Sequence, residues 1–110
     1  MPNRERRRTS AALWLMLGLA VISRSTAALA DEAVRQGARL AQSWCSACHA
    51  VGAGSTGSDI APTFAEIAER RSPDYVRGFL ANPHARGRMP TFDLSNAQIE
   101  DVVRYIYRDR

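Results

Sequence analysis

The chain has no lysine, only two cysteines and no apolar run of the length that a membrane-spanning helix requires. Two cysteines cannot build the multi-disulfide framework on which many small secreted domains depend. The longest apolar stretch, Ala11 to Ile22, has about 12 residues, whereas a transmembrane helix needs roughly 20. Because strand-like alternation and internal repeats are also lacking, we expect an all-α fold.

Residues 1–30 have the pattern of a secretory signal peptide. Their start is rich in arginine, the short apolar run follows, and Ala28-Leu29-Ala30 forms an A-x-A cleavage pattern before Asp31. Arg24, in the exit region, keeps open the alternative of an uncleaved single-helix anchor. We therefore predict a signal peptide at 1–30, one domain at 31–110 and export to the periplasm.

The net charge of +4 belongs to the leader, because residues 31–110 contain ten arginines and ten acidic residues. A nucleic-acid-binding domain needs a basic patch of its own, so we expect no nucleic-acid partner. The charges are unevenly spread, with −3 over residues 31–69 and +3 over residues 70–110. If the fold keeps these halves apart, this asymmetry can orient docking to a partner.

Four helices are expected in residues 31–110. The first extends from Asp31 to about Trp44, and a Gly/Ser-rich stretch at 50–61 follows it. The second covers residues 62–70. The third begins after an N-cap at Ser72, with Pro73 at the first helical position, and ends near residue 82. The apolar or small residues of the first helix recur at nearly 3.6-residue spacing: Val34, Gly37, Ala38, Leu40, Ala41 and Trp44.

The last helix has the clearest start signal. Ser95 and Gln98 stand at capping-box spacing, and Leu94 and Ile99 occupy the positions of a hydrophobic staple. Four apolar residues then follow at helical spacing and predict a stripe that faces a core: Ile99, Val102, Val103 and Ile106.

Both cysteines lie in the segment Cys45-Ser46-Ala47-Cys48-His49. A structural zinc site needs four nitrogen or sulfur ligands, and residues 31–110 lack a second pair at regular spacing. A thioredoxin-like redox motif needs βαβ surroundings, which a chain poor in strands does not provide. The C-x-x-C-H pattern is instead typical of covalent attachment of haem c. Two thiols on adjacent turns reach the two vinyl groups of the porphyrin, and His49 becomes the proximal iron ligand.

The sixth iron ligand decides what such a haem can do, because an open position binds small ligands whereas two protein ligands favour electron transfer. Met89 is the one methionine outside the leader, and it lies beside Pro90 in a loop where methionine makes a poor core filler. We therefore predict Met89 as the ligand, with His84 as the rival. A ligand-binding or peroxidatic haem protein with a labile Met89 remains an alternative.

With these motifs, residues 31–110 resemble the class I c-type cytochromes, and small soluble bacterial monohaem members in particular. The resemblance implies a cytochrome c-like fold with about four short helices and long loops around one covalent haem c. It implies thioethers at Cys45 and Cys48, axial ligands His49 and Met89, and a backbone carbonyl of Pro62 that orients the histidine ring. Gly37 would allow close passage of the last helix at Tyr105.

The same resemblance implies a periplasmic one-electron carrier rather than an enzyme. Its partners would be a redox donor and acceptor protein, such as a dehydrogenase, a bc1-type complex or a terminal oxidase, with membrane contact only through them. The alternative within this class is a haem subunit of a periplasmic dehydrogenase or oxidase complex. The chain departs from the family at Ala41 and Ala61, and it has no lysine ring for docking.

Overall fold

The structure is a computed structural model that describes the backbone of residues 5–82 and 89–110, and the side chains of Trp14, 25–82 and 89–110. It contains four helices and, within these residues, no strand: α1 (Glu5–Trp44), α2 (Phe64–Arg70), α3 (Pro73–Ala81) and α4 (Asn96–Ile106). The predicted all-α class is confirmed. The chain divides into two compact units, Met1–Asp31 and Glu32–Arg110, which are described separately below.

Helix α1 has 40 residues and does not begin at Asp31, so the expectation of a short first helix starting there is wrong. Residues 5–30 contain no proline and a single glycine, and they are rich in alanine, leucine and arginine, which favour helices. Nothing at Asp31 interrupts this propensity, and the helix is continuous through that position. No helix in the described part of the chain is long and apolar enough to cross a membrane.

The three remaining helices begin at capped positions. Ser72 caps α3 by accepting from the Tyr75 backbone N–H, and Ser95 forms the predicted capping box with Gln98 in α4. Helix α2 begins at Phe64 rather than at residue 62, because the Thr63 side chain accepts from the Glu66 backbone N–H. The Glu66 carboxylate in turn accepts from the Thr63 N–H, which holds the pKa of that carboxyl below its usual range.

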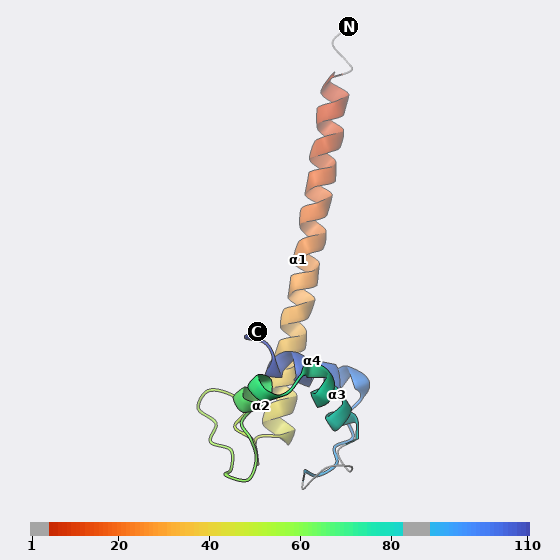
Figure 1. Cartoon of the computed structure of the whole chain (residues 1–110). Coiled ribbons are helices and arrows are strands. Elements are labelled where there is room, and N and C mark those ends of the chain that lie inside the picture. The colour runs from red at the N-terminus through yellow and green to blue at the C-terminus, as the bar shows by residue number, and fades with distance from the viewer. Residues whose placement is uncertain (1–4, 83–88) are drawn as a thin grey trace. The chain divides into compact units, whose positions relative to one another are not determined.

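The core of the second unit lies where α2, α3 and α4 gather around the C-terminal part of α1 (Figure 1). The predicted stripe of α4 is buried at all four positions. A Cβ on Gly37 would lie 2.0 Å from the Asp101 carbonyl oxygen, so α1 and α4 cross in backbone contact there. The core consists of Leu40, Ala41, Cys45, Val51, Phe64, Val76, Ile99, Val102, Val103 and Ile106.

Trp44 does not belong to this core, although its spacing placed it on the apolar stripe of α1. Its side chain is 53% exposed and meets the ring of Phe92 edge-on, with centroids 5.8 Å apart. The buried positions continue from Leu40 and Ala41 to Cys45, four residues beyond Ala41. The first cysteine therefore takes the inward position that the tryptophan was expected to fill.

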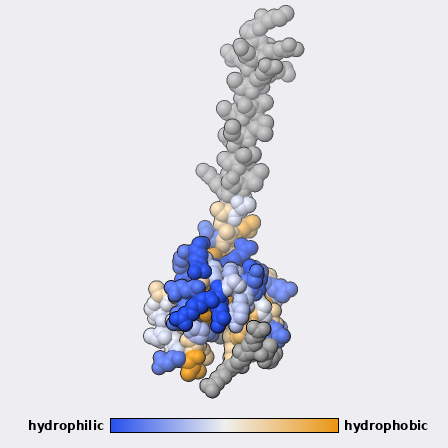
Figure 2. Space-filling view, in the orientation of Figure 1, coloured by the Kyte–Doolittle hydropathy of each residue, from blue (hydrophilic) through white to orange (hydrophobic). Residues whose placement is uncertain are grey.

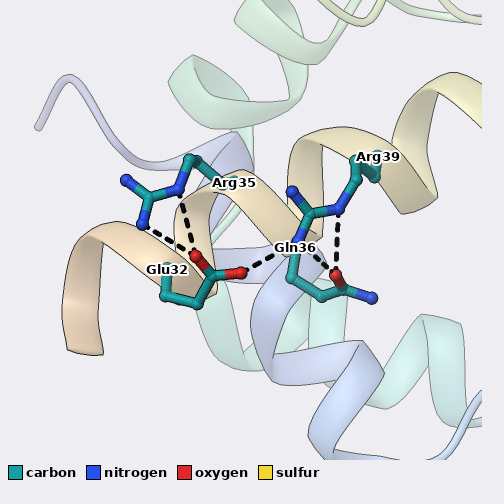
Figure 3. Close-up of polar contacts among 4 residues, drawn as sticks. All are labelled: Glu32, Arg35, Gln36 and Arg39. Atoms are coloured by element: carbon teal, nitrogen blue, oxygen red, sulfur yellow. Dashed lines mark hydrogen bonds and ion pairs between the residues drawn. The ribbon is translucent and has the colours of Figure 1, made fainter. Parts of the chain in front are cut away.

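Much of the face of the second unit that Figure 2 shows is hydrophilic. On α1, Glu32 accepts hydrogen bonds from both Arg35 and Arg39, and Arg39 also donates to Gln36 (Figure 3). The hydrogen bonds from the two arginines to Glu32 hold the pKa of its carboxyl below its usual range, and the bond from Arg35 has the larger effect. Because all three charged groups are more than half exposed, solvent screening keeps their contribution to stability small.

Candidate functional site: the cysteine and histidine segment and its cavities

The segment with both cysteines continues directly from the end of α1. The Cys45 backbone N–H donates to the Ala41 carbonyl at 2.9 Å, and the His49 N–H donates to the Cys45 carbonyl at 2.9 Å. The segment is thus one further helical turn, which brings Cys45, Cys48 and His49 together. Cys45 is buried, which raises the pKa of its thiol to about 11, while Cys48 is half-buried. Both thiols are free, without a disulfide between them.

The His49 ring has a defined hydrogen-bond partner. Its Nδ1 lies 2.6 Å from the backbone carbonyl oxygen of Pro62. Since a carbonyl can only accept, Nδ1 carries the hydrogen and donates it. The other ring nitrogen, Nε2, then keeps its lone pair, which is the form in which a histidine binds a metal. The contact between ring and carbonyl implied by the family resemblance is present.

The loop at 50–63 packs against the backbone of the cysteine segment and is joined to it by hydrogen bonds. Ser58 donates to the Cys48 carbonyl through both its backbone N–H and its hydroxyl, each at 2.9 Å. The Phe64 N–H donates to the Ala50 carbonyl at 2.9 Å. Gly57 has φ +58, and a Cβ there would come within 2.4 Å of the Ala50 nitrogen. These contacts fix the backbone on both sides of His49 and so the position from which its side chain extends.

Sequence reasoning identified this loop only as a helix breaker and missed the role of Gly57. A positive φ and a close backbone approach are properties of the folded loop, and two other glycines lie nearby in the sequence. The high glycine content was the available signal, but it could not indicate which glycine packs against the cysteine segment.

Two cavities flank the segment and share Cys45, His49 and Met89 in their linings. The first, of about 190 Å³, lies over the core and is otherwise lined almost entirely by apolar side chains of α2, α3 and α4. The second, of about 450 Å³, opens between Trp44, Ile60 and Phe92 and includes Cys48.

Met89 is half-buried and lines both cavities together with His49. It lies far from His49 in the sequence, and the structure brings the two side chains to the same apolar space. The rival ligand His84 lies outside the described residues. The described residues contain no cluster of three or more histidine, cysteine or acidic side chains that could hold a bare metal ion.

This donor set fits a haem. Two thiols lie next to an imidazole whose Nδ1 donates to a backbone carbonyl, and a thioether lines the same cavities. The surrounding side chains are mostly apolar, as suits a porphyrin face, and the Pro62 carbonyl sets the ring of the histidine.

Comparison with known proteins agrees with this chemistry. The family described as cytochrome c oxidase, cbb3-type, subunit III matches residues 32–106, which include the whole site. The chain belongs to this family of cytochrome c domains. Cytochrome c-552 of Bradyrhizobium diazoefficiens is 41% identical over 97 residues, covering 84% of this chain and 88% of the relative. No solved structure matches the chain.

Membership in the cytochrome c family makes the chain a monohaem electron-transfer protein, since it has one C-x-x-C-H segment. The family implies a covalent haem c and redox partners. Its cytochrome c domain coincides with the second compact unit, because the family match begins at residue 32 and the unit at Glu32.

Proposed function

We propose that the protein is a periplasmic one-electron carrier whose single haem c is attached to Cys45 and Cys48 and ligated by His49 and Met89. The observation that carries this proposal is the hydrogen bond from His49 Nδ1 to the Pro62 carbonyl, because it fixes the metal-binding form of the ring. The presence of Met89 in the linings of both cavities, together with His49, supports Met89 as the second ligand.

Each residue of the site has a distinct task. Cys45 and Cys48 would hold the haem covalently through their two thiols, so the loaded protein would have the mass of chain plus haem. His49 and Met89 would both ligate the iron, which would leave no position for a substrate and would favour outer-sphere electron transfer. A thioether ligand also raises the reduction potential relative to ligation by two histidines. Bound haem c supplies the exchange of one electron between ferrous and ferric iron.

The proposal also includes a role for the leader, residues 1–30. We assign residues 1–30 as a cleaved signal peptide and residues 31–110 as the domain. Two observations support this division: the compact unit Glu32–Arg110 and the start of the family match at residue 32. Export suits the chemistry, because haem c attachment takes place outside the cytoplasm. The donor and acceptor would be redox proteins such as a dehydrogenase, a bc1-type complex or a terminal oxidase.

Mass spectrometry of the protein purified from the periplasm tests attachment and cleavage together. The expected mass is that of residues 31–110 plus one haem. A Cys45→Ala/Cys48→Ala variant should have the mass of the polypeptide alone, while a Ser46→Ala control, between the two cysteines, keeps the haem. An unmodified mass for the wild-type protein would contradict the proposal.

A second candidate, a haem subunit of an oxidase complex, is favoured by the description of the matching family as a cbb3-type oxidase subunit. The two candidates share the haem site and differ in affinity for a large partner. Co-purification with an oxidase at moderate salt supports the subunit. Elution as a free small protein under the same conditions supports the carrier.

A further inference from the structure

Trp44, the last residue of α1, is more exposed than a side chain of its size usually is. Its side chain is 53% exposed, whereas the residue that follows it, Cys45, is buried. The backbone around Trp44 is fixed, because the Cys45 and Ser46 N–H groups both donate to the Ala41 carbonyl, at 2.9 and 3.1 Å. The indole therefore extends from a firmly held helical turn, directly beside the first cysteine.

The ring of Phe92 packs against this indole. The two rings meet edge-on, with centroids 5.8 Å apart and an angle of 73° between their planes. Aromatic pairs favour this geometry, which stabilises them beyond the burial of apolar area. Phe92 is half-buried and belongs to residues 89–95, which form neither helix nor strand. The contact thus joins the end of α1 to the segment that carries Met89.

Phe92 is close enough to Met89 in the chain to restrict its position. Three residues of chain span at most about 10 Å, so a fixed Phe92 confines the backbone of Met89 to that distance. Pro90 lies between them, and its fixed φ reduces the freedom of the connection further. Residues of both segments line the second cavity: Trp44, His49, Met89, Pro90 and Phe92. The aromatic contact and the two proposed iron ligands therefore share one cavity.

The other end of this segment is attached separately. Ser95 begins α4 with its capping box to Gln98, and Leu94 packs against the core. The Phe92 contact lies nearer to Met89 along the chain than either of these attachments. It also connects Met89 to a different element, α1, which leads into the cysteine segment.

We propose that Trp44 and Phe92 form an aromatic clamp that holds Met89 on the haem iron, an inference that rests on the proposed ligation. A thioether carries no charge, so the fraction of time it spends on the iron depends on how firmly its segment is held. With the clamp intact, the segment stays against the end of α1. Without it, Met89 leaves the iron more often, and a small ligand can take its place. Trp44 and Phe92 are positioning residues, because they act through Met89.

Imidazole binding to the ferric, haem-loaded protein tests the clamp, followed by visible and near-infrared absorption. Imidazole binds only to molecules in which Met89 has left the iron, so its apparent dissociation constant reports their fraction. We expect Trp44→Ala and Phe92→Ala each to bind imidazole about 2- to 10-fold more tightly than the wild type, as the strength of an aromatic pair implies. Trp44→Phe keeps a ring and restores much of the wild-type affinity.

Asp93→Asn is the matched control, because Asp93 follows Phe92 directly, is exposed and does not line the cavity. It should bind imidazole as the wild type does. The double variant Trp44→Ala/Phe92→Ala should show less than the sum of the two single effects, because either substitution removes the same contact. Wild-type affinity in both single variants would overturn the inference.

A Met89→Ala background separates an effect through Met89 from direct contact with imidazole. No thioether has to leave the iron there, so adding Trp44→Ala should not change the affinity. A change as large as in the Met89-containing protein would overturn the clamp, since Trp44 would then act on imidazole itself.

The same titrations distinguish this inference from the proposed function. If the wild type binds imidazole as tightly as Met89→Ala, then Met89 is not a ligand and the proposed ligation fails. If the wild type binds it more weakly than Met89→Ala, and Trp44→Ala and Phe92→Ala match the wild type, the ligation stands and only the clamp is refuted.

Discussion

Single backbone atoms of Pro62 and Gly57 determine the orientation of the His49 ring and the position of its backbone. The Pro62 carbonyl sets its ring from one side, and the backbone of Gly57 lies against the peptide that joins His49 to Ala50. A Cβ at position 57 would approach the His49 carbonyl carbon to 2.8 Å and the Ala50 nitrogen more closely still. Because both partners are backbone atoms, they cannot rotate away, and the loop itself would have to move.

Replacing Gly57 by alanine should therefore destabilise the protein more than replacing Gly54. Both glycines have positive φ, +58 and +81, so each alanine incurs a conformational cost of roughly 1–2 kcal/mol. Nothing lies within 4 Å of a Cβ at Gly54, whereas the clash at Gly57 should add about 1–3 kcal/mol. Chemical denaturation of the two haem-loaded variants measures the difference. Equal losses would show that the loop does not press on the His49 backbone.

At the level of helices, the crossing of α1 and α4 holds the site together. Helix α1 leads into the cysteine segment, and α4 contributes Val102 and Ile106 to the cavity lining. Tyr105 of α4 also donates from its hydroxyl to the Val51 carbonyl at 2.8 Å, in the chain just after the histidine. The close approach at Gly37 thus sets the distance between the cysteine segment and the opposite wall of the cavity.

Gly37→Ala and Gly78→Ala should have effects of opposite sign. Both glycines lie inside helices, where alanine is favoured by about 0.5–1 kcal/mol. At Gly78 nothing lies within 4 Å, so the full gain in stability is expected. At Gly37 the new methyl group meets the Asp101 carbonyl, and overpacking of this kind costs roughly 1–3 kcal/mol or more. Thermal unfolding of both variants checks the signs, and a stabilised Gly37→Ala would contradict the close crossing.

Elements whose start is decided locally were predictable from the sequence. The caps at Ser72 and Ser95 involve residues three positions apart, and the stripe from Ile99 to Ile106 needs only helical periodicity. The C-x-x-C-H segment was predictable as chemistry because its residue types and spacing are distinctive, whereas the ligand role of Met89 stays a prediction.

Features that depend on contacts between distant segments were not predictable. The outward turn of Trp44 follows from its pairing with Phe92, 48 positions along the chain. The backbone approach at Gly57 arises from the folded loop, and the hydrogen bond from the Tyr107 hydroxyl to the Arg71 carbonyl joins α4 to the end of α2. Helix α1 extends well before Asp31 because propensity alone continues it, and the sequence pattern of a leader does not describe that conformation.

For the molecule as a whole, the packed core of the small domain lies beside an apolar cavity that His49 also lines. A chain segment of this size buries a marginal core, and the described residues include no disulfide to staple it. The apolar walls of α2, α3 and α4 instead face the cavity next to His49.

The near-infrared absorption of the ferric protein tests the central claim, that His49 and Met89 together hold the haem iron of an electron carrier. We expect the methionine-to-iron charge-transfer band in the wild type and its loss in Met89→Ala. Leu80→Ala is the matched control, because Leu80 lines the same cavity and cannot ligate iron, and it should retain the band. High-spin ferric iron in the wild type, or a band that persists in Met89→Ala, would contradict the account.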